Sequence, residues 1–181
     1  MKSFLKTTLK ASARHTDNEN GWAIMSAMIA IFVGLIMMAG IFGLVQISLQ
    51  GSKVQEAQNN LSTIRTSIQQ LFAGQPDYSG LNNNLAISAD MVPESMVSGS
   101  NIVNSWSGNV TVSTGSSSST FTIQYDNVPE EACIKFAPFG YGTWQSVDVG
   151  GSSIGQSGGT AVSDAVSACG SGGNTITFTS N

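Results

Sequence analysis

The feature that most constrains the fold is a long uncharged stretch near the N-terminus. No charged residue lies between Glu19 and Lys53, and Trp22 to Val45 is apolar except for Ser26 and glycines. A helix of ~20 apolar residues is long enough to cross the ~30 Å hydrocarbon core of a bilayer. The sequence therefore predicts a membrane-spanning helix rather than a buried helix of a soluble domain.

The basic residues of the leader predict the orientation of this span. Lys2, Lys6, Lys10 and Arg14 precede the apolar run, and few basic residues follow it. Because Lys and Arg concentrate on the cytoplasmic side of a span, the N-terminus is expected in the cytoplasm and everything beyond residue 50 outside.

The N-terminal segment differs from a secretory signal peptide. The polar leader is long, the apolar run exceeds the usual ~7–15 residues, and the segment after it, LVQISLQGSK, has no small-x-small cleavage site. If the chain is cut, the favoured bond is Gly21–Trp22, because glycine leaves the backbone unhindered there. The span would then stay in the mature protein.

A basic leader that ends in glycine and continues directly into a long apolar helix resembles a type IV prepilin. The long leader and Trp22 as first mature residue resemble the type IVb branch, which includes the thin-pilus pilins of conjugative plasmids. The resemblance implies that a prepilin peptidase removes residues 1–21 on the cytoplasmic side. The family usually has Glu at the fifth mature position, and this chain has Ser26 there, so the register contact attributed to that Glu is missing.

Small residues recur along the apolar helix. In lipid, such residues favour helix association by allowing close packing, although Ala and Gly are also common in spans that do not associate. The residues predicted to pack in a filament core are Ala23, Ser26, Ala27, Ala30, Gly34, Ala39 and Gly43.

Beyond Gly51 the pattern becomes amphipathic, with apolar residues at steps of three and four. This stripe predicts packing on a globular domain; a coiled coil with a separate protein is the alternative. Gly74 and Pro76 are expected to end the helix. The predicted stripe consists of Val54, Ala57, Leu61, Ile64, Ile68 and Leu71.

The second half of the chain predicts an antiparallel sheet. Residues 109–113, 120–126, 144–149 and 175–180 alternate apolar or β-branched with polar side chains, and Gly/Ser-rich loops separate them. A helix is expected to start near Pro129. A sheet packed on the helical stripe makes the fold class α+β.

These patterns divide the chain into four parts. They are a cleaved leader (1–21), a hydrophobic membrane and filament-core helix (22–50), the amphipathic half of the same helix (51–74) and a globular α+β head (75–181).

Segments of the head also resemble type IVb pilin heads, namely Asn104–Val112, Val128–Ile134 and Ser163–Cys169. Cys133 and Cys169 fall on the outer side of the membrane, where an oxidising compartment favours a disulfide over two separate buried thiols. The resemblance implies that this disulfide bounds the variable, surface-exposed C-terminal region.

The chemistry of the outer half argues against an enzyme, a metal site or a cofactor. It has no histidine and no nucleophile followed by a plausible base, and the single histidine, His15, lies in the leader. Asp148 and Asp164 are isolated carboxylates, better explained as solvated surface than as cation ligands. Without a basic patch, nucleic acid is not an expected partner.

The expected function is that of a structural subunit, the major pilin of a type IVb pilus that serves adhesion, aggregation or conjugative mating. Its expected partners are further copies of itself in a homopolymer, prepilin peptidase and the inner-membrane pilus assembly machinery. It would reside in the inner membrane before assembly and in an extracellular filament afterwards. The alternatives are a minor pilin or pseudopilin, and a single-span membrane protein with a small extracytoplasmic binding domain.

Replacing Gly21 by a bulky residue is expected to block leader removal, because the cleaved bond would lose its unhindered glycine. Mass spectrometry of the native protein measures this: wild type should begin at Trp22, and the variant should keep residues 1–21. A normal-sized product from the variant would contradict the processing hypothesis.

Overall fold

The computed structural model describes the backbone of residues 19–155 and 160–181. Between residues 19 and 50 it describes the side chains of Met25 and residues 28–33. The chain divides into two units, Met1–Ser48 and Leu49–Asn181, and each is described by itself.

A single long helix, α1 (Glu19–Leu71), contains both apolar patterns. It begins at Glu19 rather than at the expected Trp22; an acidic residue suits a helix start because it complements the positive end of the helix dipole. Gly51 does not interrupt the helix, which ends before Gly74 and Pro76.

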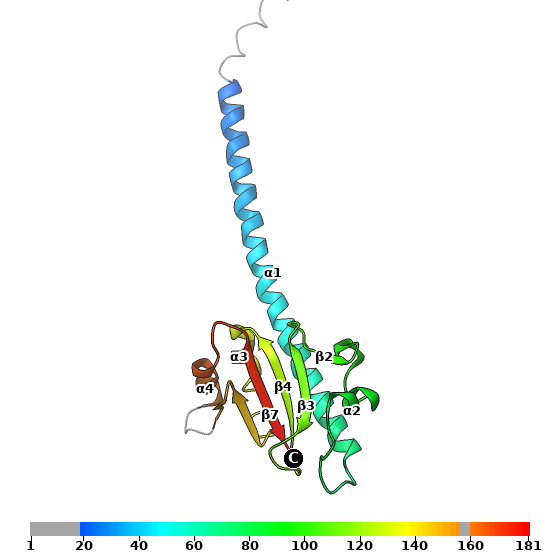
Figure 1. Ribbon diagram of the computed structural model, residues 1–181. Helices are drawn as coiled ribbons and strands as arrows, with labels where there is room; N and C mark the ends of the chain where they lie inside the picture. Colours follow the sequence, from blue (N-terminus) through cyan, green and yellow to red (C-terminus); the bar gives the residue numbers. More distant parts are fainter. Residues whose placement is uncertain (1–18, 156–159) are drawn as a thin grey trace, which may run out of the picture. The chain divides into compact units, whose positions relative to one another are not determined.

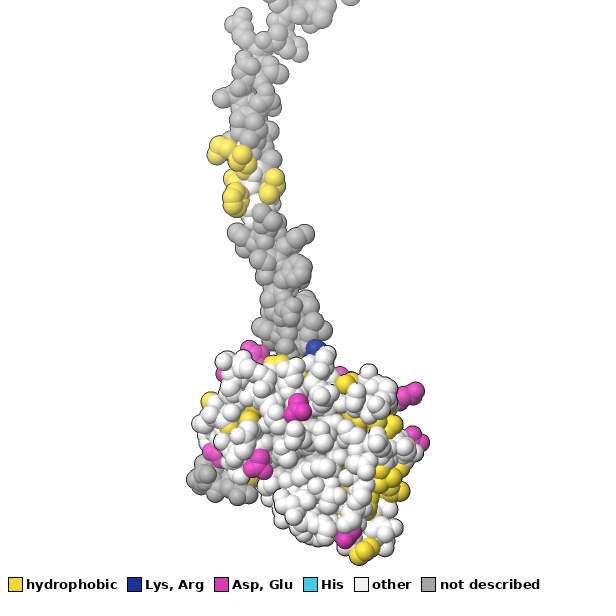
Figure 2. Space-filling view, in the orientation of Figure 1, with side chains coloured by type: hydrophobic (Ala, Val, Ile, Leu, Met, Phe, Trp, Pro, Cys, Tyr) yellow, Lys and Arg dark blue, Asp and Glu magenta, His cyan; other side chains and the backbone are white. Residues whose placement is uncertain are grey.

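The described side chains of the first unit are hydrophobic and exposed (Figure 2). The exposed fractions of the large ones range from 47% at Val33 to 67% at Phe32. Among the described residues, no helix is both long enough and apolar enough to span a membrane. Most side chains of the predicted span, Trp22 to Val45, lie outside the described residues.

The described residues of the head form three further helices, a 3₁₀ turn and one sheet. The helices are α2 (Asn83–Ser88), α3 (Glu130–Phe136) and α4 (Ala161–Ala168), and the turn is η1 (Glu94–Met96). The strands are β1 (Val97–Ser98), β2 (Asn101–Val103), β3 (Asn109–Thr114), β4 (Phe121–Val128), β5 (Ser146–Val149), β6 (Ser152–Ser153) and β7 (Asn174–Ser180).

All strand pairs of the sheet are antiparallel, in the order β1-β2-β3-β4-β7-β5-β6 (Figure 1). The four predicted strands correspond to β3, β4, β5 and β7. The helix near Pro129 corresponds to α3, for which Pro129 is the N-cap. The α+β prediction is therefore confirmed.

The core lies between one face of the sheet and the second half of α1. Alternate residues of β4 and β7 point inward and are fully buried, among them Tyr125 and Phe178. Leu61, Ile64 and Ile68 of α1 belong to the same cluster and have no exposed surface. Burying one such side chain contributes roughly 1.5–3 kcal/mol.

Polar contacts fix the direction of α1 along this core. Arg65 Nε donates to Ser180 Oγ at 3.0 Å, and its Nη2 donates to the Thr143 carbonyl at 2.6 Å. The guanidinium also lies 4.8 Å from the centre of the Trp144 ring. Because Trp144 and Ser180 come from separate segments, Arg65 joins the helix to both.

Asn83 of α2 completes the sheet beside β3. Strand β2 pairs with β3 only as far as Val110. Beyond that point Asn83 Nδ2 donates to the Val110 carbonyl at 2.9 Å, and Asn83 Oδ1 accepts from the Val112 N–H at 2.7 Å. One side-chain amide thus makes the two hydrogen bonds that a longer β2 would supply.

Asn83→Ala is expected to lower the free energy of unfolding by ~1–3 kcal/mol, because it leaves a strand N–H and a carbonyl without partners. Urea denaturation of the oxidised protein measures the change. The matched control is Asn84→Ala, which removes an exposed amide from the next position of the same helix and should change stability by less than about 0.5 kcal/mol. Equal losses for the two variants would show that the Asn83 contacts contribute nothing.

Candidate functional site

A disulfide joins α3 to the end of α4. Cys133 and Cys169 are bonded, with 5.9 Å between their Cα atoms and a sequence separation of 36. The closed loop contains β5, β6 and α4. Closing a loop of this length stabilises a fold by ~3–4 kcal/mol on the chain-entropy model.

The disulfide-bounded region carries exposed apolar side chains. Val162 and Val166 lie one turn apart on α4, and each is 56% exposed. Tyr141 is also exposed, and its hydroxyl donates to the Gly155 carbonyl at 2.7 Å. The disulfide-bounded region therefore presents these three side chains at the surface of the head.

Two buried asparagines hold the loops at the end of the sheet where β4 ends and β7 begins. Asn104 Oδ1 accepts from the N–H groups of Trp106 and Gly108, and its Nδ2 donates to the Asp126 carbonyl at 2.7 Å. Asn174 Nδ2 donates to the Val128 carbonyl at 3.0 Å and to carbonyls of the loop before β7. Both loops are therefore fixed against β4.

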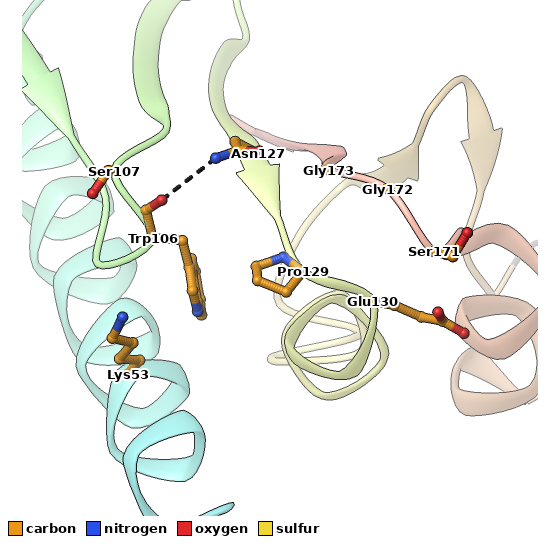
Figure 3. A pocket seen from close by; sticks show the side chains of 9 residues that line it. All are labelled: Lys53, Trp106, Ser107, Asn127, Pro129, Glu130, Ser171, Gly172 and Gly173. Atoms are coloured by element: carbon orange, nitrogen blue, oxygen red, sulfur yellow. Dashed lines mark hydrogen bonds between the residues drawn. The ribbon is translucent and has the colours of Figure 1, made fainter. Parts of the chain in front are cut away.

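These loops border a cavity of about 470 Å³ (Figure 3). Lys53 comes from α1 and Glu130 from the start of α3, and Figure 3 shows the rings of Trp106 and Pro129 between them. The cavity is lined by Lys53, Trp106, Ser107, Asn127, Pro129, Glu130, Ser171, Gly172 and Gly173.

One titratable side chain lies inside the core. Tyr125 is fully buried, and within the described part of the chain its hydroxyl has no hydrogen-bond partner. Burial raises the pKa of this hydroxyl, so it stays protonated at neutral pH. No cluster of three or more His, Cys, Asp or Glu suited to a metal ion occurs among the residues described.

Five of the six residues of the predicted stripe are buried, and the sixth is not. Leu71 is 50% exposed, because the helix ends there. Phe72 packs against the core instead, with its ring centre 5.2 Å from that of Tyr78. The buried members are Val54, Ala57, Leu61, Ile64 and Ile68.

The residues predicted for leader cleavage and for packing in a filament core lie in the first unit, Met1–Ser48. Ala30 is exposed. The side chains at the expected cleavage bond, Gly21 and Trp22, lie outside the described residues. So do those of the remaining small residues proposed for the filament core, Ala23, Ser26, Ala27, Gly34, Ala39 and Gly43.

Sequence patterns did not single out the polar residues that fix the head. Arg65, Asn83, Asn104 and Asn174 each bond to backbone atoms or side chains far along the chain. An isolated Asn or Arg has no periodic signature. Only the preference of Asn for turns, through side-chain bonds to nearby backbone, marks Asn104 as a loop residue.

The chain is similar in sequence and in fold to known proteins. A family model described as PilS N terminal matches residues 51–181. The chain is 22% identical over 129 residues to the major structural subunit of bundle-forming pilus of Escherichia coli O127:H6, covering 69% of this chain and 67% of that protein. The corresponding subunit of Escherichia coli O111:H- gives the same values.

A solved structure extends the comparison to the fold. The crystal structure of TcpA, a type IV pilin from Vibrio cholerae El Tor biotype, matches with a TM-score of 0.51 and 14% identity. The match covers 72% of this chain and 99% of that one. At this identity the likeness concerns the fold alone.

Replacing Cys133 and Cys169 together by alanine is expected to lower the free energy of unfolding by ~3–4 kcal/mol, through the added entropy of the unfolded chain. Thermal unfolding followed by circular dichroism measures it. Reduced wild type should unfold at about the temperature of the double variant. If the variant were as stable as the oxidised protein, the disulfide would have no role in stability.

Proposed function

Because the chain belongs to the PilS family and is a type IV pilin of the IVb-like class, we propose that its mature form is the major subunit of an extracellular filament. Pilins of this class are structural subunits, and the proposal includes no enzymatic activity. Adhesion, aggregation and mating contacts are the proposed uses of the filament.

The observation that best supports polymerisation is the contrast between the two parts of α1. Residues 54–68 bury their apolar stripe within the head, and Leu61 has no exposed surface. Met25, Ile29 and Phe32 are each at least 60% exposed in the single chain. Because apolar surface of this extent is unfavourable in water, it requires lipid or the same helix of neighbouring subunits.

The proposed route begins with a precursor in the inner membrane. Prepilin peptidase removes residues 1–21 at Gly21–Trp22, and the helix of residues 22–50 anchors the subunit until the assembly machinery adds it to the filament. Residues 51–74 pack against the head. The head, residues 75–181, forms the surface of the filament. The resemblance to prepilins and the apolar pattern support this route.

In the proposed filament, helices pack closely along the face with small residues. Small side chains at spacings of four let two backbones approach. Ala30 is the described member of this face, and it is exposed in the single chain. Its neighbour Ile31 is 63% exposed but does not belong to the small-residue pattern.

Ala30→Leu is expected to reduce filament yield by at least about ten-fold, because the larger side chain holds neighbouring helices apart. A ten-fold reduction corresponds to a loss of ~1.4 kcal/mol of association free energy per helix contact. Electron microscopy of sheared surface material, with identification of its main polypeptide, measures the yield. Ile31→Leu keeps the volume and should assemble normally.

Two outcomes would oppose the proposal. Normal filaments from Ala30→Leu would refute close packing at this position. Wild-type protein found only as dispersed membrane monomers would refute the filament itself and would favour a single-span membrane protein.

A further inference from the structure

The cavity beside Trp106 presents charged groups that the fold does not use. Lys53 and Glu130 both line it. In the described part of the chain, neither side chain forms an ion pair or a hydrogen bond. Figure 3 shows Lys53 and Glu130 on either side of the rings of Trp106 and Pro129.

The backbone around this cavity is held in an unusual conformation. Ser107 and Asn127 both line it, with φ values of 63° and 56°. Only one other described residue besides glycine, Asp90, has a positive φ. Such conformations cost on the order of 1–3 kcal/mol each and concentrate at ligand-binding positions.

The wall and rim of the cavity differ in chemistry. Trp106, which is 8% exposed, and Pro129 form an apolar wall. The hydroxyls of Ser107 and Ser171 and the amide of Asn127 lie around it. The volume, about 470 Å³, lies within the range of small-molecule sites, which combine apolar walls with a few polar groups.

The charges restrict the class of ligand. Residues 49–181 carry nine acidic and three basic residues, so a polyanion would be repelled. A ligand with one carboxylate would pair with Lys53, and hydroxyls at its other end would donate to Glu130. A sugar ring offers C–H faces for the apolar wall and hydroxyls for the rim.

We infer that this cavity is a binding site for a sugar that carries a carboxylate, such as a uronic acid. Lys53 binds the carboxylate, Glu130 and Asn127 bind hydroxyls, and Trp106 with Pro129 contacts the ring. This site goes beyond the pilin function and does not depend on filament assembly, because all its residues belong to the unit Leu49–Asn181 of a single subunit.

Saturation-transfer NMR titration of the detergent-solubilised full-length protein tests the inference. The probes are methyl β-glucuronide, methyl β-glucoside, which lacks the carboxylate, and acetate, which lacks the sugar. The glucuronide should bind at least about ten-fold more tightly than either of the others, as expected for one added charge-assisted hydrogen bond.

Lys53→Met keeps the aliphatic stem and should reduce glucuronide affinity to the level of the glucoside. Glu130→Gln should weaken both sugars. The matched control is Lys135→Met, which removes a lysine of α3 that does not line the cavity and should leave both affinities unchanged. Circular dichroism checks that every variant is folded.

Three results would overturn the inference. They are no saturable binding of the glucuronide, equal binding of glucuronide and acetate, and equal losses from Lys53→Met and Lys135→Met. Filament yield of Lys53→Met is recorded separately, so failure of assembly is distinguished from failure of sugar binding.

Discussion

The structure of the head depends on the burial of one apolar stripe of α1 against the sheet. Leu61, Ile64 and Ile68 supply the helical side of the core, and β4 and β7 supply the other side with Tyr125 and Phe178. Without the helix, one face of the sheet would be open to water. Residues 54–68 therefore belong to the head as much as to the helix.

The same helix carries two kinds of apolar surface with different purposes. In the second half the apolar residues form a narrow stripe, and polar neighbours such as Arg65 and Gln69 bond to the sheet and the C-terminus. In residues 28–33 every position is apolar and exposed. The stripe of the second half can pack against a single surface, the sheet. Residues 28–33 are apolar on all sides and therefore suit surroundings that are apolar in every direction.

The sequence predicted those parts of the fold in which apolar residues recur at a regular spacing. The helical stripe and the four longer strands follow from spacing alone. Strands β1, β2 and β6 are two or three residues long, too short to show alternation, and could not be predicted in this way. The cavity was also missed, because Lys53, Trp106 and Glu130 are far apart in sequence and meet only after β4 and α3 are placed against α1.

Strand β7 joins two parts of the sheet that are otherwise separate. This strand, Asn174–Ser180, lies between β4 and β5, so β5 and β6 join the rest of the sheet only through it. The hairpin of β5 and β6 comes earlier in the sequence than β7, its partner in the sheet. During folding this hairpin therefore cannot join β3 and β4 until β7 has paired with β4.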